Sequence, residues 1–182
     1  MLLRIEKLRR DHRVDDFRCG RPELDQFLSR YAFPAQQANG SVTYVGLADE
    51  DVVGFYTLVT ADVAIEEAHE RLAKGLGRYP VPLVVLARLA VRSDWQRRGI
   101  ANGLLRDAMT RTLLVGDIVG VRALAVHAKD EPTASFYAVR LHSVSDGSAA
   151  SLCADQRYSS SASQRKVITP SPPARRTAPS PA

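Results

Sequence analysis

The segment from Gln96 to Ala101 holds residue types that could bind a phosphate group. A small residue such as Gly99 lets a backbone approach a ligand closely. The segment follows the apolar run 81–91 and opens an amphipathic stretch, so we expect a helix whose first N–H groups and positive dipole end face a ligand. Arg97 and Arg98 add charge to this turn. The pattern predicts a pyrophosphate cradle, although a lone Gly-x-Ala with solvated arginines is more often a plain strand-to-helix turn.

The elements that must position this turn alternate between strand and helix patterns. Apolar, β-branched runs predict strands, and apolar residues at helical spacing predict helices. The expected strands are 2–8, 41–49, 51–60, 81–91 and 121–128, and the expected helices are 22–32, 99–114 and 131–139. The sequence therefore predicts an α/β (α+β) domain in which a mixed central sheet is flanked by helices.

Composition divides the chain at about residue 142. The stretch that follows is rich in Ser and Ala, and five of the ten prolines lie in the last thirteen residues. Such a segment buries too little apolar area to offset the entropy of ordering it. We expect one domain over 1–142 and a disordered tail over 143–182.

The net charge of +5 is not by itself a sign of nucleic-acid binding. Residues 155–182 hold five basic groups and one acidic group, which leaves 20 basic and 19 acidic groups in residues 1–154. Local charge is a better guide, because residues 78–111 hold seven arginines and only two acidic residues.

Several classes of protein are not expected from this sequence. No run of 18 apolar residues suggests a membrane span, and no apolar segment near the N-terminus suggests a secretory signal. The two cysteines form no framework, and the four histidines share no metal-ligand spacing. We therefore expect no metal and no membrane, and a cytoplasmic protein with reduced thiols.

The segment LARLAVRSDWQRRGIANGLL resembles the acetyl-CoA signature of the GNAT acetyltransferases. Four segments of the chain also stand in the order typical of GNAT-type toxins from bacterial type II toxin–antitoxin pairs. They are FRCGRPELDQFLSRYA, VVGFYTLV, YPVPLVVLARLAV and VHAKDEPTASFYA. The resemblance covers roughly residues 7–138. It implies a GNAT fold and an acetyl-CoA-dependent N-acetyltransferase.

The resemblance also assigns roles to residues of this sequence. The pantetheine arm of acetyl-CoA would pair with the backbone of Leu89, Ala90 and Val91, as an added strand does. Tyr137 would protonate the departing thiolate, whereas the alternative is an aromatic residue packed beside Phe136. The pyrophosphate would lie on the turn formed by Gln96, Arg97, Arg98, Gly99, Ile100 and Ala101.

In this toxin group the acceptor is the α-amine of an aminoacyl-tRNA, and its acetylation stops translation. Arg78, Arg88 and Arg92 are candidates for phosphate contacts with the tRNA. Five arginines between residues 9 and 21 are further candidates, although an ordinary solvated surface would look the same. The implied partners are a ribbon-helix-helix antitoxin and a second copy in a homodimer.

Two other functions remain open from the sequence. One is a GNAT acetyltransferase of a protein or small-molecule amine. The other is an inactive remnant that only binds CoA or its antitoxin.

The sequence departs from the family pattern after Tyr137. The family has an Arg/Lys-x-Gly-Phe element and a final Leu-rich strand, whereas this chain reads VRLHSVSDGSAASLCADQ. Back-translation with suitable codons, shifted by one base, yields R-F-G-F-I-P-S-P-T-D-P and then L-R-L-C-A-L-I-K. We therefore formulate the hypothesis of a frameshift near Ala138 and expect the last strand to be missing.

Overall fold

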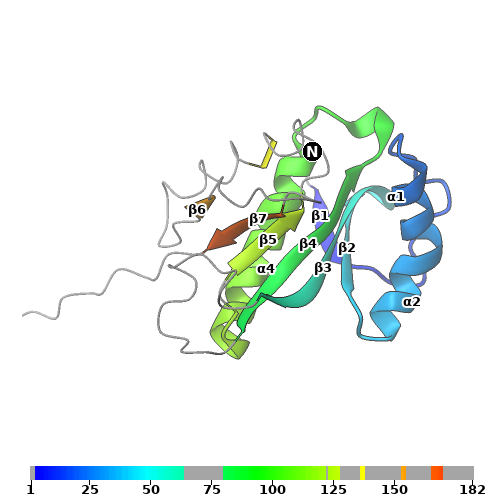
Figure 1. Cartoon of the computed structure of the whole chain (residues 1–182). Coiled ribbons are helices and arrows are strands. Elements are labelled where there is room, and N and C mark those ends of the chain that lie inside the picture. Colours follow the sequence, from blue (N-terminus) through cyan, green and yellow to red (C-terminus); the bar gives the residue numbers. More distant parts are fainter. Residues whose placement is uncertain are drawn as a thin grey trace, which may run out of the picture.

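The computed structural model describes residues 3–63, 80–121, 123–127, 136–137, 153–154 and 165–169. Within these residues a seven-stranded sheet has the order β1-β2-β3-β4-β5-β7-β6, with helices on both of its faces (Figure 1). The predicted mixed sheet flanked by helices is confirmed.

The first four strands pair with one another in chain order, and each of these pairs is antiparallel. They are β1 (Arg4–Lys7), β2 (Val42–Ala48), β3 (Asp51–Val63) and β4 (Val81–Val91). Ala48 pairs with Asp51, so β2 and β3 form a hairpin with a two-residue turn in which Asp49 takes a φ of 55°. The strand β4 has the bounds that the apolar run 81–91 predicts.

Helices cover the two faces of the sheet separately. The helices α1 (Pro22–Gln26), η1 (Phe27–Tyr31) and α2 (Ala32–Gln37) lie on one side, and α4 (Ile100–Val119) lies on the other (Figure 1). Each side has its own buried cluster. The cluster beneath α4 includes Leu86 and Leu104, and the cluster beneath α1 and α2 includes Phe27 and Phe55.

Pro34 explains why the N-terminal helix contains the π-helical turn η1. A proline inside a helix donates no N–H, and its ring clashes with the carbonyl four residues earlier, here that of Arg30. The widened turn at Phe27–Tyr31 lies just before this point, and the N–H of Ala32 donates to the carbonyl oxygen of Phe27. Phe27 and Leu28 are buried by this arrangement, while Tyr31 is exposed.

Gly54 on β3 sets the distance between the sheet and α4. A Cβ atom at this position would lie 2.9 Å from a methyl carbon of Leu104 and 3.0 Å from the carbonyl oxygen of Ala90. Only glycine permits this approach without a shift of neighbouring atoms. The N-terminal half of α4 is thereby held close to the end of β4.

After Tyr137 the structure describes only residues 153–154 and 165–169, so the disordered tail expected over 143–182 stays a prediction, whereas a strand is present at the sheet edge where the last strand was expected to be missing. The strand β5 (Ala123–His127) pairs parallel to β4, β7 (Arg165–Thr169) pairs antiparallel to β5, and β6 (Cys153–Ala154) pairs with β7.

Candidate active site

The site begins where β4 and β5 separate. Leu86 and Val126 are the last residues paired between them, although β4 continues to Val91. Arg88 pairs with Thr57 and Leu86 pairs with Leu58, which leaves Ala87 as an extra residue in β4. Such a β-bulge bends a strand and re-aims its backbone. From this bulge onward, β4 is paired with β3 alone among the described strands.

The backbone phase of β4 identifies which groups face the open edge. The N–H of Arg92 donates to the carbonyl oxygen of Val53 on β3 at 2.9 Å. Successive residues of an extended strand direct their polar groups to alternate sides. Ala90 therefore faces β3, as Arg92 does, whereas Leu89 and Val91 direct their N–H groups at the open edge. An extended acyl chain carrying amides could pair there as an added strand.

The turn after β4 has the backbone shape that a phosphate cradle needs. Gly99 is the N-cap of α4 with a φ of 82°, and Arg97 has a φ of 63°. The carbonyl oxygen of Gly99 accepts from Asn102 and Gly103, so the amides of Ile100 and Ala101 belong to the first turn and have no helical acceptor. Apart from Gly99 itself and its two neighbours in the chain, no atom of the described residues lies within 4 Å of a Cβ built on Gly99. Space, free N–H groups and the positive helix end therefore coincide.

The side chain of Gln96 makes two hydrogen bonds within the chain. Its Nε2 donates to the carbonyl oxygen of Cys19 at 3.0 Å and to that of Val91 at 3.1 Å. These bonds fasten the turn to the end of β4 and to the N-terminal segment. Gln96 thus shapes the turn through the Nε2 donors of its side chain, and its contact with the pyrophosphate stays a prediction.

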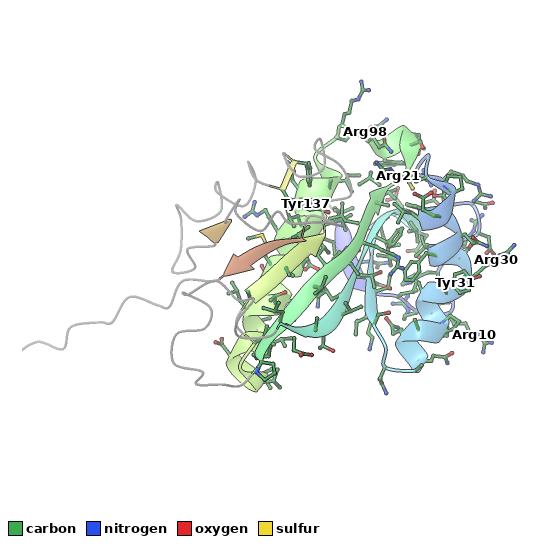
Figure 2. The ribbon with its side chains drawn as sticks, viewed as in Figure 1. Arg10, Arg21, Arg30, Tyr31, Arg98 and Tyr137 are labelled. Carbon is green, nitrogen blue, oxygen red and sulfur yellow. The ribbon has the colours of Figure 1, made fainter. Side chains whose placement is uncertain are left out.

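The arginines around the turn are not equivalent. Arg92 holds Asp94 through two bonds, at 2.8 and 3.0 Å. The Arg98 guanidinium lies 4.9 Å from the ring centroid of Trp95, so the half-buried indole supports it. Figure 2 shows Arg98 projecting from the end of the molecule that carries this turn. Arg97 is exposed beside it.

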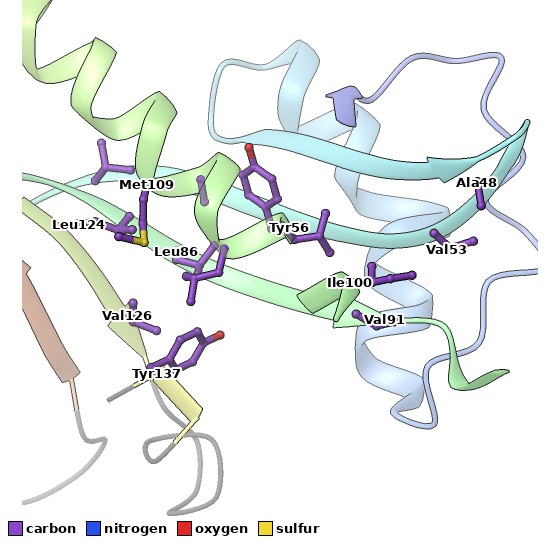
Figure 3. Close-up of a cluster of buried hydrophobic side chains, with 14 residues drawn as sticks. Ala48, Val53, Tyr56, Leu86, Val91, Ile100, Met109, Leu124, Val126 and Tyr137 are labelled. Atoms are coloured by element: carbon purple, nitrogen blue, oxygen red, sulfur yellow. The ribbon is translucent and has the colours of Figure 1, made fainter. Parts of the chain in front are cut away.

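Tyr137 packs on the α4 side of the sheet, near the end of β4. It is buried in the cluster that contains Leu86 and Val126, and the ring of Phe136 meets it edge-on with centroids 5.2 Å apart. Its hydroxyl points toward Val91 (Figure 3). Burial raises the pKa of Tyr137 to about 12, so the phenol keeps its proton at neutral pH.

Arg88 lies on the other face of the sheet. Its guanidinium carbon is 3.7 Å from the ring centroid of Phe27, in the layer of α1 and α2. No carboxylate of the described chain pairs with it, and burial lowers the pKa of the guanidinium. Arg78 lies outside the described residues.

The N-terminal arginines form no common site. Arg9 pairs with Glu6 and Asp11, Arg13 lies 3.9 Å from Asp16, and Arg18 donates to backbone carbonyls. In Figure 2, Arg10 projects from the side of the molecule on which α2 lies, away from the turn that carries Arg98. The group is therefore divided. Arg10 lies away from the turn, whereas the carbonyl oxygen of Arg18 accepts from the backbone N–H of Ser93 at 2.8 Å, just before the turn, and Figure 2 shows Arg21 at the same end of the molecule as Arg98.

The structure describes the side chains of Cys19 and His12. Cys19 is a packed residue, and burial raises the pKa of its thiol to about 11. His12 accepts from the Arg9 N–H through Nδ1, so Nε2 carries the proton and donates to Glu6 at 2.9 Å. The side chain of His127 lies outside the described residues. No cluster of three potential metal ligands occurs among the residues that the structure describes.

Within the described part of the chain, no helix combines the length and the apolar character needed to cross a membrane.

Sequence reasoning missed two contributors to this site. The contact between Phe27 and Arg88 joins residues 61 positions apart, and no local pattern pointed to it. The two hydrogen bonds of the Gln96 side chain could not be predicted, because a glutamine at this position also fits a phosphate contact. The Pro34 ring, four residues after Arg30, was the available signal for a distorted helix in this layer.

The chain is similar to several known proteins. Residues 6–142 match the model described as "Acetyltransferase (GNAT) family". A "tRNA-acetylating toxin" from Mycobacterium tuberculosis is 39% identical over 124 residues, which are 68% of this chain and 74% of the toxin.

Solved structures agree with this result. A mutant AtaT toxin, bound to the C-terminus of the antitoxin AtaR and to acetyl-CoA, superposes with a TM-score of 0.63 at 28% identity, over 76% of this chain and 83% of that one. AtaT complexed with acetyl-methionyl-tRNA has a TM-score of 0.74 at 23% identity, over 92% and 94% of the two chains, and shows likeness of fold. The predicted family is thus confirmed: the chain belongs to the GNAT acetyltransferase family.

Proposed function

We propose that this chain is an acetyl-CoA-dependent N-acetyltransferase toxin that acetylates the α-amine of aminoacyl-tRNA and thereby blocks translation. The observation that carries the proposal is the opening between β4 and β5 beyond Leu86 and Val126, in a chain 39% identical to a tRNA-acetylating toxin. Acylation of the α-amine removes the nucleophile that peptide-bond formation requires.

The residues of the opening suit acetyl-CoA. The N–H groups of Leu89 and Val91 would pair with the pantetheine amides, as in an added strand. The amides of Ile100 and Ala101 would hold the pyrophosphate with Arg97, Arg98 and the free space at Gly99. Bound there, acetyl-CoA supplies an activated acetyl group as a thioester.

The chain itself contributes position, a proton and a polar backbone to the reaction. The neutral α-amine forms a C–N bond with the thioester carbonyl, and a backbone N–H at the open edge of β4 stabilises the negative oxygen that develops. As the C–S bond breaks, Tyr137 gives its proton to the thiolate. The phenolate then regains a proton from the newly acylated nitrogen through solvent.

We further propose that the protein works in the cytoplasm, that a ribbon-helix-helix antitoxin is its partner and that it assembles as a homodimer. The solved AtaT complex with the C-terminus of its antitoxin supports a protein partner of this kind. Arg88 and Arg92, with Arg78, are the candidates for tRNA phosphates.

Expression in a bacterium that lacks the antitoxin tests the function in a cell. We expect growth and incorporation of labelled amino acids to stop soon after induction. Expression of Tyr137→Phe at the same level should leave both rates at those of the empty vector. Continued protein synthesis with the unaltered, folded chain would contradict the proposal and favour the inactive remnant.

A further inference from the structure

The partly buried arginines of the described chain fall into two kinds. Arg92, Arg111 and Arg88 are the three whose side chains are partly buried. Arg92 binds Asp94 at 2.8 Å, and Arg111 binds Asp107 at 2.8 Å. Arg88 lies over the Phe27 ring at 3.7 Å and has no carboxylate partner among the described residues.

An unpaired cation that has lost part of its water is an unfavourable arrangement unless an anion reaches it. Desolvation lowers the pKa of Arg88, and no acidic group offsets the effect. Phe27 supports one face of the guanidinium, and no carboxylate of the described residues meets the donors at its edge. Those donors match the paired oxygens of a phosphate, which arginine binds in a bidentate manner.

The position of Arg88 in the fold indicates which phosphate group the side chain would bind. Arg88 follows the bulge at Ala87 and directly precedes Leu89, where β4 turns its backbone to the open edge. Its side chain is on the α1 and α2 face, whereas Tyr137 closes the opening from the α4 face. An acceptor that approaches from the Arg88 side would meet the acetyl group between the two faces.

We propose that Arg88 is a positioning residue that binds the phosphodiester preceding the aminoacylated terminal nucleoside of the tRNA acceptor. This phosphodiester is one ribose away from the ester that carries the α-amine. A guanidinium next to Leu89 that grips it would fix the amine at the thioester. The inference rests on the proposed function and assigns this contact to Arg88, because Asp94 already neutralises Arg92.

Two small acceptors test the proposal. Aminoacylated cytidylyl-adenosine contains the phosphodiester, and aminoacyl-adenosine lacks it. For the unaltered protein at saturating acetyl-CoA, kcat/KM should be higher for the dinucleotide. Arg88→Gln should lower kcat/KM for the dinucleotide about 10–100-fold, the usual value of a charge-assisted hydrogen bond, mainly through KM. It should leave kcat/KM for aminoacyl-adenosine unchanged.

Two further variants keep the test decisive. Arg88→Lys retains the charge without the paired donors, so it should give an intermediate value for the dinucleotide and retain the fold even if Arg88→Gln does not. Arg106→Gln removes the charge of an exposed α4 arginine and should change neither acceptor.

Equal losses for both acceptors with an Arg88 variant would show a structural role and overturn the inference. Unchanged values for both would also overturn it. If the unaltered protein acetylates aminoacyl-adenosine and the dinucleotide but not full aminoacyl-tRNA, or none of the three, the proposed function fails instead.

Discussion

Leu86 and Val126 are the last residues through which β4 and β5 pair, and beyond them each strand keeps only its partner on the other side. The bulge at Ala87 lies directly after Leu86. The opening therefore results from backbone geometry, and the N–H groups of Leu89 and Val91 face it. Binding of acetyl-CoA would complete a sheet that the fold leaves open at this point.

Replacement of Gly99 by glutamate should abolish measurable binding of acetyl-CoA. The new carboxylate would lie at the helix N-terminus, in the open space where the pyrophosphate is expected, and would repel it. The φ of 82° adds about 1–2 kcal/mol of strain, which a folded protein can tolerate. Isothermal titration calorimetry measures the affinity directly.

Gly120→Glu is the matched control for Gly99→Glu. Gly120 has a φ of 74° at the other end of α4, and a Cβ there also meets no atom within 4 Å. It carries the same strain and the same charge change, and its affinity for acetyl-CoA should remain normal. Normal affinity of a folded Gly99→Glu variant for acetyl-CoA would refute the assignment of this turn as the pyrophosphate-binding site.

Replacement of Tyr137 by phenylalanine should retain acetyl-CoA binding and lower kcat about 10²–10⁴-fold, the usual contribution of a general acid. The ring continues to fill its place beside Leu86 and Val126, and only the proton donor is lost. Tyr56→Phe is the control, because Tyr56 is also buried but its hydroxyl donates to Asp107. An unchanged kcat for Tyr137→Phe would refute the assigned role.

The dependence of kcat on pH should carry the signature of a buried phenol. Burial disfavours the phenolate and raises the pKa of Tyr137 to about 12, so the donor proton is retained as pH rises from 7 to 10. We expect no fall of kcat with a midpoint near 10 in stopped-flow assays at saturating substrates. A fall with that midpoint, absent in Tyr137→Phe, would mean that the tyrosine is solvated and its pKa ordinary.

Replacement of Gln96 by alanine should weaken both the fold and the cofactor site. The carbonyl oxygens of Cys19 and Val91 lose their donor, which lowers the free energy of unfolding by about 1–2 kcal/mol. The turn is then less well fixed, so the Kd for acetyl-CoA should rise. Gln37→Ala, at an exposed residue of α2, should change neither quantity in urea denaturation or calorimetry. A Gln96 variant with unaltered stability would mean that these bonds do not hold the turn in solution.

Two truncations test the contribution of β7. Ending the chain after Gln164 removes β7 and exposes the edge of β5, so Tm should fall by several degrees, since 1 kcal/mol shifts Tm by about 2–4 °C at this size. Ending it after Thr169 removes only the proline-rich residues that follow and should leave Tm unchanged. Equal Tm values for both would mean that β7 adds nothing to stability.

The frameshift hypothesis predicts a further gain in stability and in toxicity. Joining the shifted reading R-F-G-F…L-R-L-C-A-L-I-K after Tyr137 should raise Tm above that of the given chain and increase toxicity, because it supplies a longer apolar strand for the edge of β5. Calorimetry and growth curves measure both effects. A gene that admits no such reading, or equal stability and toxicity of the two chains, would reject the hypothesis.

The sequence predicted local elements better than the contacts between them. The apolar run of β4 and the hydrophobic stripe of α4 depend on neighbours in the chain, so their patterns identified them. The contact of Phe27 with Arg88 and the pairing of Ala125 with Val167 depend on chain topology, which periodicity does not encode. The strand β7 escaped prediction because an unpaired edge elsewhere in the sheet determines whether so short an apolar segment forms a strand.

The site shows the same division. The turn at Gly99 was predicted because glycine and its helix are local features, and its positive φ agrees with that reading. The role of the Gln96 side chain was not, since its two acceptors belong to Cys19 and Val91. That acetyl-CoA and tRNA bind through the assigned residues stays a prediction.

The most direct test of the central claim identifies the product of the reaction. The purified chain is incubated with labelled acetyl-CoA and either charged or deacylated tRNA, and the terminal nucleoside is analysed by mass spectrometry after nuclease digestion. The account predicts N-acetyl-aminoacyl-adenosine from charged tRNA alone, formed at a rate that Tyr137→Phe lowers at least 100-fold. Label on protein or small amines with none on aminoacyl-adenosine, from a protein that binds acetyl-CoA, would contradict it.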